Sequence, residues 1–215
     1  MGNVVKIKTM RNSLSKSLIN KAIRHLTSSD KILSDFIIKH GPCLIKPSID
    51  NPFHALASSI ISQQISARAA RAIKGRLFDL LGTERMTPKK ILKLSPKNFR
   101  AIGLSRPKSK YIRELALAVK KGDLDFPSIS NSDDEIVIEK LTAFSGIGEW
   151  TAEMFLIFGL GRLDVLSTID AGLKKGFKIM YGLQDIPSAD EMLSISKPWR
   201  PYRSIASWYL WRVVD

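Results

Sequence analysis

Apolar residues recur at spacings of three and four along most of the chain, which is the pattern of helices with one buried face. Asp30 is placed to cap one such helix, which should end at Gly41. Asn51 and Pro52 form the N-cap and first position of another, with an inward face of Phe53, Leu56, Ala57, Ile60 and Ile61. Strand signals are sparse, with residues 4–7 and 43–45 as the short candidates. The pattern therefore predicts an all-α fold.

Helical patterns continue to the end of the chain. They run from Ser66 to Gly82, over about 106–121, over 150–160, from near Asp170, from a capping box at 188–191, and from Arg200 onward. We predict a single domain over residues 1–215, made of two lobes around a cleft. The central lobe is expected at about 51–130, with the N-terminal and C-terminal helices forming the other lobe. The polar stretch 128–134 is the expected crossing between them.

The charge of the chain points to a polyanionic partner. Lys and Arg number 34 against 20 Asp and Glu, which gives a net charge of +14. Nucleic acid and anionic membrane surfaces both fit such an excess. No apolar run reaches the roughly 18 residues of a membrane-spanning helix, so we expect no membrane role. A solvated basic surface is the alternative that charge alone leaves open.

Few residues are available for metal or disulfide chemistry. Cys43 is the one cysteine, which excludes an internal disulfide and a four-cysteine cluster and fits a reducing, intracellular compartment. His25, His40 and His54 are not spaced as metal ligands. We therefore expect no metal site built from side chains.

A tight glycine turn joins two helical patterns at residues 146–148. Gly146 and Gly148 permit a turn that other residues resist, and the helix that follows would begin with unpartnered backbone N–H groups. Such groups form a site for an anion, for example a DNA phosphate. An ordinary helix–helix turn is the alternative if nothing else accompanies the motif.

Other blocks do accompany it. Residues 141–152 (LTAFSGIGEWTA) and 164–173 (DVLSTIDAGL) resemble the helix-hairpin-helix, loop and aspartate of the DNA glycosylase superfamily that carries this motif. Within that superfamily the chain is most similar to 3-methyladenine DNA glycosylase II. The resemblance extends to residues 51–53, 62–66, 103–108, 198–200 and 208–211, in the family's order. The chain departs from the pattern at Ser145 and near Thr168, where prolines are common, and in having Ile169 and Ala171 around the aspartate.

The resemblance assigns catalysis to Asp170. A fixed carboxylate stabilises the positive charge that develops on the sugar when a base leaves, and it orients or deprotonates the attacking water. A plain helix N-cap is the alternative role for Asp170, and Asp164 is expected to be structural. Relatives that also cleave the DNA backbone carry a lysine where this chain has Trp150, so the resemblance implies base release without a Schiff base.

The resemblance also implies a base pocket and a DNA-binding surface. Trp150 is the expected pocket aromatic, with Phe53, Trp199 and Met154 as weaker candidates, whereas core packing is favoured for Trp208 and Trp211. Gln64 is expected to fill the gap left by the extruded base. Phosphate contacts are expected from the backbone of Gly146 and Gly148, and further contacts from Thr151, Lys108, Arg68 and Arg71. Arg68, Arg71 and Lys74 should share one basic stripe. A monovalent cation held by hairpin carbonyls is a further implication.

These inferences predict a monomeric enzyme of base-excision repair that acts on double-stranded DNA containing damaged bases. The expected substrates are alkylated purines of the 3-methyladenine and 7-methylguanine type, and the expected location is the cytoplasm and nucleoid or the nucleus. A catalytically weak or inactive DNA-damage-binding protein of the same fold is the alternative. A glycosylase for another lesion is a third interpretation, against which the missing lysine and the missing cluster cysteines argue.

Overall fold

The computed structural model describes residues 14–214, and all regular secondary structure in this range is helical. The helices are α1 (Lys16–Ser29), α2 (Lys31–His40), α3 (Pro52–Ser62), α4 (Ala67–Leu81), α5 (Pro88–Leu92), α6 (Pro96–Ala101), α7 (Arg106–Lys121), α8 (Phe126–Ser130), α9 (Asp134–Thr142), α10 (Glu149–Phe158), α11 (Ala171–Tyr181), α12 (Ala189–Ser196), the 3₁₀ turn η1 (Lys197–Trp199) and α13 (Arg203–Val214). The all-α prediction is confirmed. Residues 43–45 form no strand, and the other strand candidate, residues 4–7, lies outside the described residues.

The helix boundaries follow from local capping. The Asp30 carboxylate accepts the Leu33 N–H at the start of α2, and the Asn51 side chain accepts the His54 N–H at the start of α3. Ser188 and Glu191 form the capping box of α12. Each cap supplies a partner for an N–H group that the first helical turn leaves free, so these three sequence predictions are confirmed.

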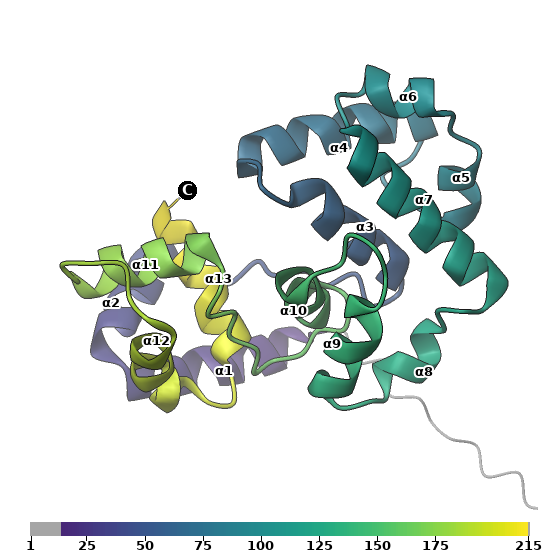
Figure 1. The fold of residues 1–215 in the computed structure, drawn as a ribbon. Coiled ribbons are helices and arrows are strands. Elements are labelled where there is room, and N and C mark those ends of the chain that lie inside the picture. Colours follow the sequence, from purple (N-terminus) through teal and green to yellow (C-terminus); the bar gives the residue numbers. More distant parts are fainter. Residues whose placement is uncertain (1–13, 215) are drawn as a thin grey trace, which may run out of the picture.

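The helices pack in two groups (Figure 1). Helices α3 to α10 form one lobe, in which α10 packs against α3 and α9 and α7 packs against α3, α5 and α6. Helices α1, α2, α11, α12 and α13 form the other, with α11 against α13 as a main contact. The chain crosses between them over residues 41–51 and 159–170. The predicted crossing at 128–134 is wrong, because α8 and α9 pack together there and keep the chain in the first lobe.

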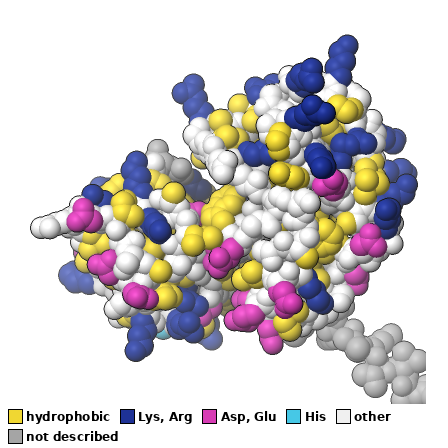
Figure 2. Space-filling model, viewed as in Figure 1, with side chains coloured by type: hydrophobic (Ala, Val, Ile, Leu, Met, Phe, Trp, Pro, Cys, Tyr) yellow, Lys and Arg dark blue, Asp and Glu magenta, His cyan; other side chains and the backbone are white. Residues whose placement is uncertain are grey.

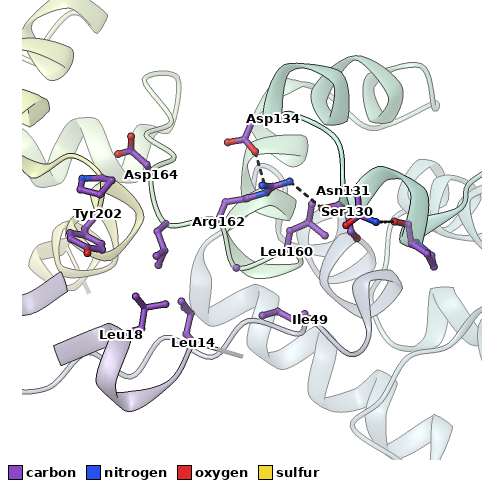
Figure 3. Close-up of a pocket in the computed structure, with 14 residues that line it drawn as sticks. Leu14, Leu18, Ile49, Ser130, Asn131, Asp134, Leu160, Arg162, Asp164 and Tyr202 are labelled. Atoms are coloured by element: carbon purple, nitrogen blue, oxygen red, sulfur yellow. Dashed lines mark hydrogen bonds and ion pairs between the residues drawn. The ribbon is translucent and has the colours of Figure 1, made fainter. Parts of the chain in front are cut away.

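Two arginines fix the second crossing segment. Arg203 donates from Nε to Asp164 Oδ1 at 2.7 Å, which gives Asp164 the structural role expected of it. Arg162 bonds the Ser132 carbonyl at 2.7 Å and Asp134 at 3.2 Å. These contacts border a hollow of about 740 Å³ between the lobes, where Arg162 reaches toward Asp134 and Ser130 (Figure 3). Asp170 does not line this hollow.

Basic side chains are prominent on the lobe that contains α4 to α7, while several acidic side chains gather near the junction of the lobes (Figure 2). Within residues 14–214, none of the helices combines the length and apolar character needed to span a membrane. The same residues contain no group of three or more His, Cys, Asp or Glu side chains arranged to hold a metal ion.

Trp199 belongs to the core of the second lobe, which corrects its prediction as a pocket residue. Its side chain is 0% exposed, and its indole N–H donates to Asp30 Oδ2 at 2.9 Å. The same oxygen accepts the Tyr181 hydroxyl at 2.7 Å, and the rings of Phe177 and Tyr181 stack near the indole. Asp30 therefore links α2, α11 and η1.

Replacing Asp30 by alanine should lower the free energy of unfolding by about 3 kcal/mol. The change removes a helix cap and leaves a buried indole N–H and a tyrosine hydroxyl without their acceptor. Urea unfolding followed by circular dichroism measures the effect. Asp35→Ala is the matched control, because Asp35 forms an exposed pair with Lys31 and should cost less than about 0.5 kcal/mol. Equal stability of the two variants would contradict the assignment.

Candidate active site

A groove of about 860 Å³ brings four separate segments together between the lobes. The turn after α3 contributes residues 62–66, and the start of α7 contributes Lys108 and Tyr111. The hairpin and α10 contribute Gly148, Trp150 and Thr151, and the start of α11 contributes residues 170–172. The segments that the sequence singled out separately thus line one surface, which we call the inter-lobe groove.

Asp170 lies on this groove with its carboxyl group held by three N–H donors. It is 7% exposed and caps α11, where Oδ1 accepts the Leu173 N–H at 2.6 Å. The Trp150 indole donates to Oδ2 at 2.5 Å, and the Trp211 indole donates to Oδ1 at 3.0 Å. Asp170 is therefore both the helix cap that local sequence favours and a fixed acceptor group facing the groove.

Trp211 is a site residue that sequence reasoning missed, because core packing was the favoured role for it. Its indole reaches Asp170 through the close packing of α13 on α11. Two glycines allow that approach. A Cβ at Gly176 would lie 2.6 Å from the Leu210 carbonyl oxygen, and a Cβ at Gly172 would lie 3.1 Å from Asp170 Oδ1 and 3.2 Å from the Trp211 ring. The glycine pair following Asp170 was the available signal.

The glycine turn forms the predicted helix–hairpin–helix between α9 and α10. Gly146 has φ +79°, and a Cβ there would lie 2.1 Å from a ring carbon of Tyr111, so both its conformation and its packing need glycine. Gly148 is exposed, and nothing lies within 4 Å of where its Cβ would be. No side chain caps α10. Its first N–H groups therefore suit an anion such as a phosphate.

The turn after α3 is held in a strained conformation. Gln64 is exposed and has φ +54°, which is uncommon for a residue other than glycine. The preceding residue, Gln63, donates from its side-chain amide to the Gly146 carbonyl and to Thr151 Oγ1, both at 2.8 Å. Sequence reasoning selected Gln64 and overlooked Gln63, which fastens the turn to the hairpin.

Two predicted DNA contacts have partners inside the protein. Thr151 is 2% exposed and accepts the Gln63 amide. Lys108 donates from Nζ to the carbonyl oxygens of Ile61 at 2.9 Å and Gln63 at 2.5 Å, and burial lowers its pKa. Both side chains line the groove while fixing its wall, because carbonyl groups at the end of α3 need donors. The structure therefore gives both side chains a structural role, and their phosphate contacts stay predictions.

The predicted basic stripe on α4 divides into two parts. Arg68 and Arg71 are exposed, whereas Lys74 is partly buried and lines a second cavity of about 350 Å³. Met154 and Trp150 line the same cavity, which keeps both beside the site. Phe53 is a buried core residue that lines neither the groove nor this cavity, so its prediction as a pocket residue is wrong.

A buried acid lies close to Asp170 and was also missed. Burial raises the pKa of Glu153 to about 7, although the hydrogen bond from the Ser167 hydroxyl, at 2.5 Å, acts in the opposite direction. This bond ties α10 to the segment three residues before Asp170. Ser167 precedes Thr168, near which the sequence departs from the proline pattern.

The chain is similar to known proteins over most of its length. The family model described as "HhH-GPD superfamily base excision DNA repair protein" matches residues 57–201. The chain is 34% identical to the alkylbase DNA glycosidase-like protein mag2 of Schizosaccharomyces pombe, over 90% of this chain and 92% of that protein.

Two solved structures are similar as well. The fission yeast 3-methyladenine DNA glycosylase Mag1, in complex with abasic DNA, is 31% identical with a TM-score of 0.80, over 89% of this chain and 95% of that one. A DNA-3-methyladenine glycosidase from Bacillus halodurans is 41% identical with a TM-score of 0.69, over 89% and 88%. The family match spans more than half of the sequence and includes the hairpin and Asp170, so this chain belongs to the HhH-GPD superfamily of base excision DNA repair proteins.

Proposed function

We propose that this protein is a DNA glycosylase that releases alkylated purines from double-stranded DNA in base-excision repair. The observation that carries the proposal is the Asp170 carboxyl group, held by two indoles and a backbone N–H on a groove beside the hairpin. Relatives named DNA-3-methyladenine glycosylase support the substrate class, including DNA-3-methyladenine glycosylase 1 of fission yeast, at 33% identity over 90% of this chain.

The chemistry follows from the position of Asp170. A damaged nucleotide leaves the base stack and enters the groove. As the base–sugar bond lengthens, positive charge grows on the deoxyribose, and the fixed carboxylate stabilises it without reorganising. The same carboxylate orients or deprotonates the water that attacks the sugar. The products are a free base and an abasic site.

The enzyme is expected to stop at base release. Trp150 occupies the hairpin position at which lyase relatives carry an amine, and its indole N–H is already bonded to Asp170. Without an amine, no Schiff base with the sugar forms by that route. Trp150 instead holds the carboxylate and contributes an aromatic surface beside a base that carries positive charge.

DNA is held by the hairpin and the basic lobe in this proposal. The exposed Gly148 turn and the N-terminus of α10 bind a phosphate. The exposed side chains of Arg68 and Arg71 add positive charge on α4, and Gln64 fills the gap in the base stack. The carbonyl oxygens of Phe144 and Gly146 each accept one hydrogen bond and keep a second lone pair, whereas the Gly148 carbonyl accepts both the Thr151 and the Ala152 N–H. A monovalent cation at the hairpin stays a prediction.

Action as a monomer stays a prediction. Genomic DNA as the substrate implies an intracellular location. A non-catalytic DNA-damage-binding protein is the alternative function. The carboxyl group held at the groove and the names of the relatives favour catalysis over it.

Incubation with methylated genomic DNA tests the proposal. Mass spectrometry of the small molecules released should detect 3-methyladenine or 7-methylguanine at rates well above spontaneous loss, and alkali should reveal the matching abasic sites. Strand cleavage without alkali should not increase. Tight binding of methylated DNA with no released base would support the non-catalytic alternative.

A further inference from the structure

A second cavity lies directly behind the active-site indole. It has a volume of about 350 Å³ and shares Trp150 and Ser62 with the inter-lobe groove. The remaining lining comes from α3, α4, α10 and the crossing segment at residues 46–48. We call it the Lys74 cavity. Its volume is at the lower end of the range for small-molecule sites, which is sufficient for one nucleobase.

One wall of this cavity is apolar and is connected to Asp170. It consists of Trp150, Met154 and Phe158. Trp150 donates to Asp170, and the Phe158 ring lies 5.7 Å from the ring of Trp211, the second indole bonded to Asp170. A flat ring bonded to a sugar at Asp170 would therefore have aromatic and thioether surfaces within reach.

The rest of the lining includes several hydrogen-bond donors. Among the described residues, neither Lys46 nor Lys74 has a hydrogen bond or ion pair, and both line the cavity. Burial is the main cause that lowers the pKa of Lys74, with Arg71 adding to it. The Ser58 hydroxyl oxygen is buried and has no partner within residues 14–214. These unpaired donors favour an occupant that offers lone pairs.

His54 adds a donor to the same lining. Burial lowers its pKa, and the charges of Lys74 and Arg85 lower it further, while Asp50 opposes them. The neutral ring is therefore favoured at neutral pH. Since Nδ1 accepts the Met86 N–H at 3.3 Å, the ring proton lies on Nε2. No carboxylate is among the described residues that line the cavity.

We propose that the Lys74 cavity receives the extruded base and that Lys74 selects purines with a carbonyl oxygen at C6 over purines with an amino group there. This inference rests on the proposed glycosylase function and specifies its substrate class. A guanine-type base presents the O6 acceptor, whereas an adenine-type base presents an amino donor at the same place. An ammonium group pairs with the first and is mismatched with the second.

A phosphate oxygen would also satisfy these donors, but the lining favours a base. A phosphate would leave the apolar side chains of Trp150, Met154 and Phe158 uncovered, whereas the face of a purine ring packs on them and its polar edge meets the donors in the rest of the lining. The two occupants predict different behaviour. A phosphate contact contributes equally to every lesion, because it carries no information about the base.

The test compares two bases released from one sample of methylated DNA. 7-Methylguanine and 3-methyladenine both form as positively charged nucleosides, so the comparison holds the charge of the base constant while the group at C6 changes from a carbonyl to an amino group. In Lys74→Met, the initial rate of 7-methylguanine release should fall about tenfold, as expected for a lost charge-assisted hydrogen bond. The rate of 3-methyladenine release should stay unchanged or rise. Asp170→Asn protein gives the spontaneous background, and Lys97→Met, an exposed lysine on α6, is the matched control.

Other results for the two release rates would contradict the inference, and each would point to a different role for Lys74. An equal fall for both bases would assign Lys74 to phosphate binding, and no change for either would remove it from recognition. A wild type that releases neither base would contradict the proposed function itself. In that case, the binding affinities of wild type and Lys74→Met are compared on two duplexes, one with hypoxanthine and one with adenine at the same position. If Lys74→Met loses affinity only for the hypoxanthine duplex, the proposed selectivity is supported. If its affinities for both duplexes equal those of wild type, the selectivity is overturned.

Discussion

Replacing Asp170 by asparagine should lower the rate of base release by about a thousandfold and leave DNA affinity nearly unchanged. The amide keeps an oxygen that caps α11 through the Leu173 N–H, so the fold should persist. It removes the negative charge that we propose stabilises the deoxyribose, and its NH₂ group must then meet one of the two indole donors. Single-turnover release of 7-methylguanine measures the rate, and fluorescence anisotropy with a labelled duplex measures the affinity.

Control measurements distinguish a loss of catalysis in Asp170→Asn from a loss of stability or of DNA binding. Asp185→Asn, which makes the same chemical change in an exposed loop, should retain the wild-type rate. An equal melting temperature for Asp170→Asn and wild type would exclude unfolding as the cause. If Asp170→Asn releases the base at the wild-type rate, the assignment of Asp170 as the catalytic residue is contradicted. A loss of DNA affinity as large as the loss of rate would show that Asp170 mainly shapes the groove.

The predictable part of this fold is the part that depends on neighbours in sequence. The caps at Asp30, Asn51 and Ser188 each bond an N–H three residues ahead, so a short window of sequence contains both partners. The hairpin and Asp170 were identified from the resemblance of two short continuous segments, residues 141–152 and 164–173, to a known family. The lobe boundary was wrong because polar residues at 128–134 resemble a linker, yet α8 and α9 pack against each other through it.

The part of the site that sequence reasoning missed depends on contacts between distant segments. Trp211 lies 41 residues from Asp170, and Gln63 lies 83 residues from Gly146. Nothing in either local pattern separates a bonded indole from one that only packs in the core. Trp199 illustrates the reverse error, since its indole N–H finds the carboxylate of Asp30, which is 169 residues away. Residue type indicated that each indole needs an acceptor, but only the packing of helices decides which one.

Replacing Lys108 by methionine should impair the extrusion of well-paired lesions more than that of poorly paired ones. Lys108 donates to the carbonyl oxygens of Ile61 and Gln63, so it holds the turn that presents Gln64, the proposed wedge, at φ +54°. Without these bonds the strained turn relaxes, and the gap left by an extruded base is filled less well. Release of 7-methylguanine opposite cytosine should fall about tenfold, since the charge-assisted bonds that fix the turn are lost.

The dependence of the rate on whether the lesion is base-paired distinguishes a role in holding the wedge turn from a phosphate contact. Opposite an abasic analogue, the lesion is already unpaired and costs less to extrude, so Lys108→Met should recover most of the wild-type rate. A phosphate contact would lower both rates equally, and the loss would vary with salt because phosphate binding releases counterions. Lys110→Met is the matched control, because this neighbouring lysine forms an exposed pair with Glu114 and should leave both rates unchanged. If Lys108→Met lowers the rate equally on both duplexes, Lys108 contacts DNA phosphate and does not act by holding the turn. Gln63, which donates to the Gly146 carbonyl, would then be the side chain that holds the wedge turn to the hairpin.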